Sequence, residues 1–403
     1  MIEARQFVEA ARERGFHWYA GVPCSYLTPF INYVLQDPSL HYLSMANEGD
    51  AVALMAGVAL GGEAAGTTGA RVQHGRGIAM MQNSGLGNAV SPLTSLTWTF
   101  RLPVLLIVTW RGEPGVPDEP QHALMGPVTP EMLRTMQIPW ELFPSESGAI
   151  GPVLDRAVAH MTETGRPYAL VMQKGSVAPH ALKPGEAVNA SRPGTFAAAV
   201  VKDFAADPAR RPSRREALQE VIARTPGDST VVLASTGFCG RELYAIEDRS
   251  NQLYMVGSMG CVVPLALGLA LKRPDLRVLA LDGDGAALMR LGAFATAGAY
   301  GPRNLRHLLL DNGVHDSTGG QATVSDHVSF GAIAVACGYA DALETDRLDT
   351  VGEWLSAPDL RGPRFARLLI RPGTPDGLPR PSMTPVDVKR RLMQHFASAA
   401  GAT

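Results

Sequence analysis

Short apolar runs alternate with helix-like stretches along the whole chain. The runs are rich in Val, Ile, Leu and Met on both faces, which is typical of strands in a parallel sheet that is covered by helices. Apolar segments of helical length lie at 48–60 and 262–272. The pattern therefore predicts an α/β fold with two parallel-sheet, three-layer domains. The predicted strands are residues 77–82, 103–110, 168–173, 230–235, 277–282, 305–311 and 366–370.

The pattern weakens between the two halves. Residues 182–217 are rich in Ala, Pro and Arg and show little periodicity, which is typical of a linker, here with a helical piece inside it. We therefore expect a first domain at 1–181, a linker at 182–215 and a second domain at 216–398. The first 18 residues predict an amphipathic, charged helix and lack the apolar core of a signal peptide.

Composition and charge are those of a globular enzyme. The 403 residues suffice for two domains with their own cores, and 46% of them are hydrophobic and 18% charged. The formal charge of −2 creates no field that would attract nucleic acid or an anionic membrane, and no apolar run is long enough to span a bilayer. The four cysteines are far apart and form no CxxC pair, which favours a reduced, cytoplasmic setting over a disulfide framework or a zinc site.

An acidic turn interrupts the apolar pattern at residues 282–285, Asp-Gly-Asp-Gly. Two carboxylates at the end of a buried strand repel each other and are costly to desolvate, so the turn is either solvated or meant to hold a cation. Asn312 lies 28 residues after Asp284 (312 − 284) and follows the next predicted strand. That separation fits a strand, a crossover helix and a neighbouring parallel strand. Both turns then lie at the carboxyl edge of the sheet, where ligands bind in open α/β folds.

These two turns carry oxygen ligands that suit Mg²⁺. Asp284 offers a carboxylate oxygen, Asn312 an amide oxygen, and the backbone carbonyl of Val314 a third, with room for water and phosphate oxygens. The helix starts after Gly285 and around 316–318 would present N–H groups to an anion. The sequence thus predicts a diphosphate that is bridged to the protein by a metal ion.

A GDG turn alone is commonly a solvated β-turn. Its pairing with an Asn at the next strand end, however, resembles the diphosphate–metal motif of thiamine-diphosphate (ThDP) enzymes, and residues 257–271 resemble the segment that leads into that motif. There is no GxxxxGK[ST] P-loop, and residues 83–88 lack the third glycine of a Rossmann motif. The resemblance implies ThDP and Mg²⁺ as cofactors, with Phe238 either bending the cofactor or packing in the core. The residues that it places on the cofactor in the second half are Thr236, Gly237, Phe238, Gly257, Ser258, Met259, Gly283, Asp284, Gly285, Ala286, Asn312, Val314, His315, Asp316 and Ser317.

The resemblance also implies a glutamate at the start of a helix in the first half. In ThDP enzymes this carboxylate binds N1′ of the cofactor's aminopyrimidine, which then removes the thiazolium C2 proton. Glu48 fits because it precedes an apolar helical segment with small residues, although position alone leaves Asp50 and Glu63 open as surface or N-cap acids. The pyrimidine-binding and diphosphate-binding domains that meet at one cofactor usually come from different subunits, so the resemblance implies at least a homodimer. The short linker leaves no room for a third, middle domain.

A closer resemblance, to the phosphonopyruvate decarboxylases, covers nearly the whole chain outside the linker and the tail. It implies decarboxylation of the 2-oxo acid 3-phosphonopyruvate to phosphonoacetaldehyde and CO₂, a step of phosphonate antibiotic biosynthesis. Two alternatives remain, a sulfopyruvate decarboxylase and a non-catalytic, ThDP-binding regulatory protein. A carboligase resembling acetolactate synthase is disfavoured, because it would carry the middle domain. The matching stretches are 21–30, 46–54, 81–96, 110–122, 257–260, 282–286 and 311–321.

The residues that would hold the substrate are less well defined. A carboxylate and a phosphonate favour cations and N–H donors. Arg111 has a structural alternative, an ion pair with Glu113 or Asp118, and Asn83, which we also place near the cofactor, can be explained by turn chemistry alone. The candidates in loops after strands are Ser25, Asn83, Ser84, Arg111, His122 and His315.

Two histidines are candidate proton donors. A decarboxylase must protonate the carbon that has lost CO₂, and histidine titrates in the right range. His122 is favoured over His315 because its loop lies in the pyrimidine-side domain, where related decarboxylases keep active-site histidines. Either residue could instead be a surface or satisfied polar group.

Overall fold

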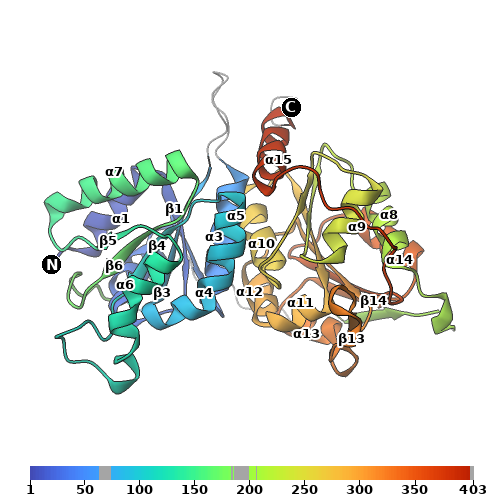
Figure 1. The fold of residues 1–403 in the computed structure, drawn as a ribbon, viewed down its shortest axis with the longest axis horizontal. Helices are drawn as coiled ribbons and strands as arrows, with labels where there is room; N and C mark the ends of the chain where they lie inside the picture. The colour runs from blue at the N-terminus through green and yellow to red at the C-terminus, as the bar shows by residue number, and fades with distance from the viewer. Residues whose placement is uncertain (63–73, 183–184, 186–198, 206, 400–403) are drawn as a thin grey trace. The chain divides into compact units, whose positions relative to one another are not determined.

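The computed structural model describes all residues except 63–73, 183–184, 186–198, 206 and 400–403. The chain divides into two compact units, of which the first contains the described residues up to 185 and the second those from 199 onward. Each unit has its own parallel sheet, as the apolar pattern predicts (Figure 1). No helix among the described residues is long and apolar enough to cross a membrane.

The first unit contains a six-stranded sheet in which every paired neighbour runs parallel. The order across the sheet is β2-β1-β3-β4-β6-β5. Strands β3 and β4 are buried along almost their whole length, because helices cover both faces of the sheet. The strands are β1 (Phe16–Gly21), β2 (His41–Ser44), β3 (Arg76–Gln82), β4 (Leu105–Thr109), β5 (Trp140–Leu142) and β6 (Tyr168–Met172).

Helices α1 and α7 lie on one side of this sheet and α3 on the other (Figure 1). On the first side the rings of Phe7, Phe30 and Phe143 contact one another within the apolar core. Apart from Asp50, helix α3 is apolar on all sides after Glu48, and every residue after Glu48 is buried. The helices are α1 (Ala4–Arg12), α2 (Thr28–Gln36), α3 (Glu48–Gly61), α4 (Leu86–Pro92), α5 (Trp98–Phe100), α6 (Met125–Thr135) and α7 (Ser147–Thr164).

The second unit contains a seven-stranded parallel sheet in the order β7-β14-β15-β11-β10-β8-β9. Helices α10 and α12 lie on one side, and α8, α9 and α14 on the other (Figure 1). The strands are β7 (Val200–Asp203), β8 (Thr230–Ala234), β9 (Gln252–Tyr254), β10 (Arg277–Gly283), β11 (Leu305–Asp311), β14 (Asp341–Thr345) and β15 (Arg364–Leu369). The helices are α8 (Arg214–Arg224), α9 (Phe238–Ile246), α10 (Val262–Lys272), α11 (Asp284–Met289), α12 (Gly292–Tyr300), α13 (Phe330–Ala336), α14 (Leu348–Ser356) and α15 (Pro385–Ala399).

All seven predicted strands are present, but two boundary predictions are wrong. Helix α1 ends at Arg12, and the chain turns at Gly15, whose φ of +84° is in the left-handed region, to begin β1 within the predicted helix 1–18. Part of the predicted linker 182–215 is strand β7, which pairs with β14 at the edge of the second sheet. The described residues of the linker before Arg214 form β7 and a short 3₁₀ turn (Pro208–Arg210), and helix α8 begins only at Arg214, at the end of the predicted linker.

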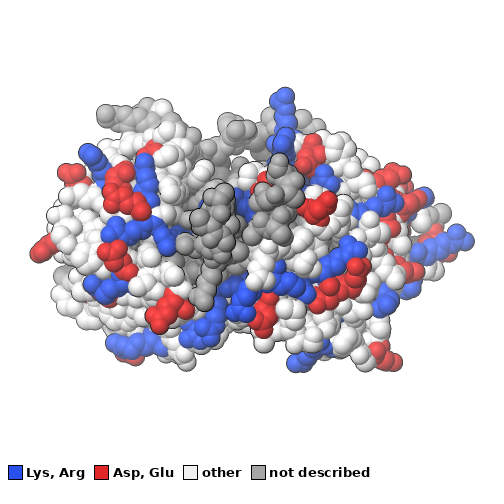
Figure 2. Space-filling view, turned by 90° about the horizontal axis from the view of Figure 1, so that it is seen from above, with Lys and Arg blue, Asp and Glu red and all other residues white. Residues whose placement is uncertain are grey.

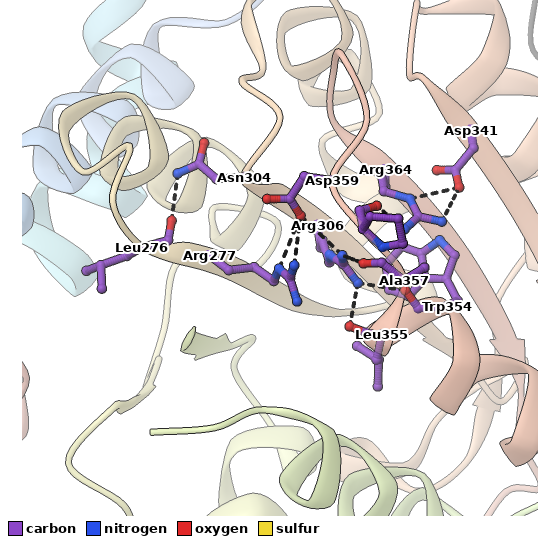
Figure 3. Close-up of polar contacts among 11 residues, drawn as sticks. Leu276, Arg277, Asn304, Arg306, Asp341, Trp354, Leu355, Ala357, Asp359 and Arg364 are labelled. Carbon is purple, nitrogen blue, oxygen red and sulfur yellow. Dashed lines mark hydrogen bonds and ion pairs between the residues drawn. The ribbon is translucent and has the colours of Figure 1, made fainter. Parts of the chain in front are cut away.

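Acidic and basic side chains are interspersed over much of the face drawn in Figure 2, in keeping with the formal charge of −2. One arginine, in contrast, is fully buried. Arg306, near the start of β11, donates hydrogen bonds to the carbonyls of Trp354 (2.6 Å), Leu355 (2.5 Å) and Ala357 (Figure 3). The last carbonyls of a helix lack partners within it. Arg306 therefore fastens the end of α14 to the amino edge of the sheet, away from the predicted site.

Candidate active site

Glu48 is the first residue of helix α3. The side chain of Asn47 caps the helix by accepting a hydrogen bond from the Gly49 amide at 2.8 Å. The Asn88 side-chain amide donates to Glu48 Oε2, also at 2.8 Å. Glu48 is partly exposed, whereas the alternative acid Asp50 is 1% exposed. The other alternative, residue 63, lies outside the described residues.

Gly85 packs directly against the Glu48 side chain. A Cβ at this position would lie 2.5 Å from Glu48 Cγ and 2.6 Å from Cδ and Oε1. Side chains do not approach so closely, so only glycine leaves room for the carboxylate where it lies. The turn after β3 therefore fixes Glu48 from two directions, through Gly85 and through Asn88.

Polar side chains gather at the carboxyl edge of the first sheet. The Cys24 thiol, after β1, donates to Gln82 Oε1 at 3.5 Å and lies 3.4 Å from Thr109 Oγ1, which brings the ends of β1, β3 and β4 together. Gln82 in turn donates to the hydroxyl of Ser84, an exposed residue, at 2.8 Å. Ser25 is exposed and lines a neighbouring cavity of about 490 Å³. Both predicted serines are thus accessible at this edge.

Asn83 lies beneath this surface. It is fully buried, and its amide group donates to the Arg111 carbonyl at 2.8 Å and to Thr129 Oγ1 at 3.0 Å. Its buried side-chain oxygen makes no hydrogen bond among the described residues. Asn83 therefore ties the loop after β4 to helix α6, and its contact with cofactor or substrate stays a prediction.

Arg111 is clamped by Asp118. Its Nε and Nη2 donate to the two carboxylate oxygens at 2.7 and 2.5 Å, and two backbone amides donate to the same carboxylate at 2.8 Å. These hydrogen bonds raise the pKa of Arg111 and hold the pKa of Asp118 well below its usual range. Of the two ion-pair partners that the sequence offers, the structure shows Asp118, whereas Glu113 accepts a hydrogen bond from Gln173.

His122 is buried at the end of the same loop. It is 5% exposed, and its Nδ1 has no hydrogen-bond partner among the described residues. Gly112 packs against its backbone, where a Cβ would lie 2.1 Å from the His122 carbonyl oxygen. A buried ring nitrogen without a partner is unfavourable unless a ligand or a water molecule meets it. A role of His122 in proton transfer stays a prediction.

A pocket opens at the carboxyl edge of the second sheet, after β8, β10 and β11. It brings together the two turns that the sequence separates, since neighbouring strands β10 and β11 pair in parallel register up to Gly283. Gly257 and Ser258 do not line it, although Ser258 takes up the left-handed conformation (φ +55°) just before Met259. The predicted cofactor residues that do line it are Thr236, Gly237, Phe238, Met259, Gly283, Asp284, Gly285, Ala286, Asn312, Val314, His315, Asp316 and Ser317.

Asp284 and Asn312 fit the binding of a divalent cation. Asp284 is 4% exposed; burial raises its pKa, and a hydrogen bond from the Thr323 hydroxyl opposes that rise. A cation beside a buried carboxylate would favour its ionised form. The Asn312 amide group donates to Asp316 at 2.8 Å and its oxygen accepts from the Val314 amide at 3.3 Å, so the side chain has a defined orientation. One carboxylate with neutral oxygens is a ligand set that Mg²⁺ accepts.

The other acid of the turn, Asp282, has a different environment. It is 1% exposed, and its carboxylate lies 3.5 Å from Nε2 of the fully buried His307. The two acids of the turn therefore have different partners.

The ring of His315 packs on Gly285, where a Cβ would lie 2.3 Å from the ring carbon Cε1. That contact is possible only with glycine at 285.

The sequence did not reveal Arg214 as a residue of the pocket. It begins helix α8, is 7% exposed, and forms ion pairs with Glu242 (2.7 Å) and with Asp316. Burial raises the pKa of Glu242, and Arg214 opposes the rise. Because Arg214 lies in the segment expected to be a linker, the only sequence signal was the Ser213–Glu216 capping box that starts α8.

Comparison with known proteins identifies the domain that contains most of this pocket. Residues 236–354 match the family model described as "Thiamine pyrophosphate enzyme, C-terminal TPP binding domain". A thiamine diphosphate-dependent 4-hydroxybenzoylformate decarboxylase from Rhodococcus jostii has the same fold, with a TM-score of 0.66 at 13% identity over 92% of this chain and 99% of its own. The fold is thus that of ThDP-dependent enzymes, and the matched segment contains most of the residues that line the pocket.

Relatives that match almost the whole chain show to which group of ThDP-dependent enzymes it belongs. A phosphonopyruvate decarboxylase of Streptomyces viridochromogenes is 43% identical, over 97% of this chain and 94% of its own. One of Streptomyces hygroscopicus is 41% identical, over 98% and 94%. A sulfopyruvate decarboxylase of Methanosarcina acetivorans is 26% identical, over 96% of both chains. The chain belongs to the phosphonopyruvate decarboxylase family of ThDP-dependent enzymes, as the motif resemblance predicts.

Proposed function

We propose that this protein decarboxylates 3-phosphonopyruvate to phosphonoacetaldehyde, with ThDP and Mg²⁺ as cofactors, as a step of phosphonate antibiotic biosynthesis. The observation that carries the proposal is the pocket in which Asp284 and Asn312, from neighbouring strand ends, lie together. The family membership of nearly the whole chain supports the substrate.

Mg²⁺ would be held by Asp284, Asn312 and the carbonyl of Val314, with diphosphate oxygens and water completing the shell. Nothing lies within 4 Å of where a Cβ at Gly283 would sit, so a phosphate group can approach the backbone there. When bound, ThDP supplies the thiazolium ring that takes up the electrons released as CO₂ leaves.

Glu48 is the residue that we assign to the aminopyrimidine of the cofactor. A carboxylate held by Asn88 and confined by Gly85 can present one oxygen in a fixed direction, which a hydrogen bond to N1′ requires. Since the domains that share a cofactor in such enzymes usually belong to different subunits, we propose a homodimer or a larger homo-oligomer. A cytoplasmic location is supported by the four cysteines, none of which takes part in a disulfide among the described residues.

The substrate would meet the carboxyl edge of the first sheet. Arg111 is proposed to bind an anionic group of the substrate, because the Asp118 clamp fixes the plane of its guanidinium and so favours directional recognition. Ser25 and Ser84, both exposed, would add hydroxyl donors. His122, with its unpartnered buried Nδ1, is proposed as the proton donor. His315, in the pocket of the second unit, is the second candidate for that role.

The proposal is tested by measuring CO₂ release from the purified protein with ThDP and Mg²⁺. Phosphonopyruvate, sulfopyruvate and pyruvate are supplied in parallel, because a phosphonate can be a dianion and a sulfonate only a monoanion. Strong preference for phosphonopyruvate supports the proposal, and preference for sulfopyruvate overturns the substrate. No CO₂ from any of the three, with ThDP still bound, keeps the cofactor and overturns the activity on these substrates.

Two variants test the assignments within the site. Glu48→Ala should bind ThDP and remain folded but lose turnover by about 10²–10⁴-fold, the usual loss for a missing acid–base group. Turnover at the parent rate would refute the assignment of Glu48. Asp284→Ala should instead lose affinity for the cofactor, and unchanged ThDP binding would remove Asp284 from the metal site.

A further inference from the structure

Asp316 lines the pocket, but both of its carboxylate oxygens are already hydrogen-bonded within the protein. Its Oδ2 accepts hydrogen bonds from the Asn312 amide group at 2.8 Å and from Arg214 Nη2. The Gly373 backbone amide donates to both carboxylate oxygens at 3.2 and 3.3 Å. The side chain is 10% exposed. Both oxygens therefore already have partners within the protein.

Arg214 anchors this carboxylate from behind. Its Nη1 donates to Glu242 Oε1 at 2.7 Å and to Thr374 Oγ1 at 3.1 Å, while its Nη2 binds Asp316. Glu242 is 1% exposed and the Asp316 side chain 10%, so two largely buried carboxylates hold the guanidinium in one orientation. One buried guanidinium thus faces two carboxylates, and the charge of Arg215 also acts on Glu242.

We propose that Asp316 is a positioning residue that sets the direction of the Asn312 side chain, with Arg214 and Glu242 as its anchor. A side-chain amide can present either its oxygen or its NH₂ group. Because Asp316 accepts from the NH₂ group, the oxygen, which accepts from the Val314 amide at 3.3 Å, is the end that keeps a lone pair for a cation. The inference rests on the proposed Mg²⁺ and ThDP cofactors, and it changes the role of Asp316 from a cofactor contact to a determinant of the metal ligand beside it.

A different role would be purely structural, since the ion pairs also hold helix α8 to α9. The two roles predict different results for Asn312→Asp. Both oxygens of a carboxylate can bind a cation, so an aspartate at 312 needs no partner to orient it. Its carboxylate would, however, lie about 3 Å from that of Asp316, and the two negative charges would repel each other. The substitution should therefore weaken Mg²⁺ binding when Asp316 is present and restore it when Asp316 is absent.

The experiment titrates Mg²⁺ calorimetrically into protein with saturating ThDP. Asp316→Ala and Asn312→Asp should each weaken Mg²⁺ binding, by about 10–100-fold for the loss of the orienting partner. The double variant should bind Mg²⁺ more tightly than either single variant. Asp376→Ala removes an exposed acid on a nearby loop and should match the parent. Unchanged binding by Asp316→Ala, or a double variant weaker than both singles, would overturn the proposal.

Thermal unfolding without cofactor shows whether Asp316→Ala remains folded. If it does not, Asp316→Asn takes its place, because asparagine keeps the shape and can donate to the carboxylate that Asn312→Asp introduces. In that background Asp316→Asn should restore Mg²⁺ binding relative to Asn312→Asp alone, and a failure to do so refutes the inference. The readout is independent of turnover. A parent protein that binds Mg²⁺ and ThDP but releases no CO₂ refutes the proposed reaction only, whereas one that binds neither refutes both proposals.

Discussion

The Asn88 side chain donates a hydrogen bond of 2.8 Å to Glu48 Oε2, and it does so from the helix that follows Gly85. A Cβ built on Gly85 would lie only 2.5 Å from Glu48 Cγ, so this position has room for glycine alone. The two contacts come from one short segment, so the backbone of that segment determines where the carboxylate lies. This relationship makes the position of Glu48 testable without changing Glu48 itself.

Gly85→Ala should displace the Glu48 carboxylate. The added methyl group cannot fit, and a shift of about 1 Å in a catalytic group can cost on the order of 10²-fold in rate. We expect kcat for CO₂ release to fall by about that factor. Gly87→Ala is the matched control in the same helix, because nothing lies within 4 Å of its Cβ position, and it should keep the parent rate. Equal rates for the two variants would show that Glu48 tolerates displacement or has no catalytic role.

Two glycines of the acidic turn should respond differently to alanine. At Gly285 a Cβ would collide with the His315 ring at 2.3 Å, so Gly285→Ala should lower the free energy of unfolding of the cofactor-free protein by about 1–3 kcal/mol. At Gly283 a Cβ meets open space at a φ of −116°, so Gly283→Ala should leave that stability unchanged.

The same pair reports on the cofactor. If a diphosphate group approaches the backbone at Gly283, the harmless methyl group of Gly283→Ala becomes an obstacle, and ThDP binding should weaken although the fold is intact. Chemical unfolding gives the stability and calorimetry gives the ThDP affinity of each variant. Parent-like ThDP affinity in Gly283→Ala would mean that the cofactor does not contact this turn.

Much of the fold follows from local sequence pattern. The buried strands have apolar residues on both faces, so β3, β4, β10 and β11 are visible as runs. Strands at the sheet edges lack that signature. Strand β7 has exposed residues in its middle, and β5 has only three residues. An apolar run in the sequence therefore predicts neither strand. Short edge strands are defined by the neighbour with which they pair, and that neighbour is distant in sequence.

Some residues of the candidate site were likewise predictable from the sequence, and others were not. Asp284 and Asn312 were predictable because each follows a buried strand and parallel strands align their carboxyl ends. Arg214 was not, because it reaches the pocket through ion pairs with Glu242 and Asp316 that only the tertiary structure brings together. The burial of Asn83 was also beyond reach, since turn residues are usually exposed and this one lies under the loop after β4.

The Arg111–Asp118 clamp predicts a dependence of stability on pH. The pKa of Asp118 is lowered in the folded protein, so its contribution to stability is complete above its ordinary value of about 3.9 and is lost as the pH falls below that value. Asp118→Asn should therefore melt at a lower temperature than the parent at pH 7, and the difference should narrow below about pH 4. Asp155→Asn, which breaks an Arg–Asp pair with a 65% exposed carboxylate, should change the melting temperature little. A difference for Asp118→Asn that stays constant down to pH 3 would contradict the assignment.

Arg306 should matter for stability far more than its neighbour Arg277. Arg306 is fully buried and binds three backbone carbonyls at the end of α14, whereas the side chain of Arg277 is 27% exposed and pairs with Asp359 at 3.0 Å (Figure 3). Arg306→Met keeps most of the volume but leaves three buried acceptors without donors, each of which costs about 1–3 kcal/mol. We expect a loss of about 3 kcal/mol or more in the free energy of unfolding, and less than about 1 kcal/mol for Arg277→Met. Urea unfolding measures both, and because the cluster lies at the amino edge of the sheet, ThDP affinity should be unchanged in either variant. A stable Arg306→Met protein would show that water can replace the guanidinium at the end of α14, and weakened ThDP binding would show that this edge communicates with the site.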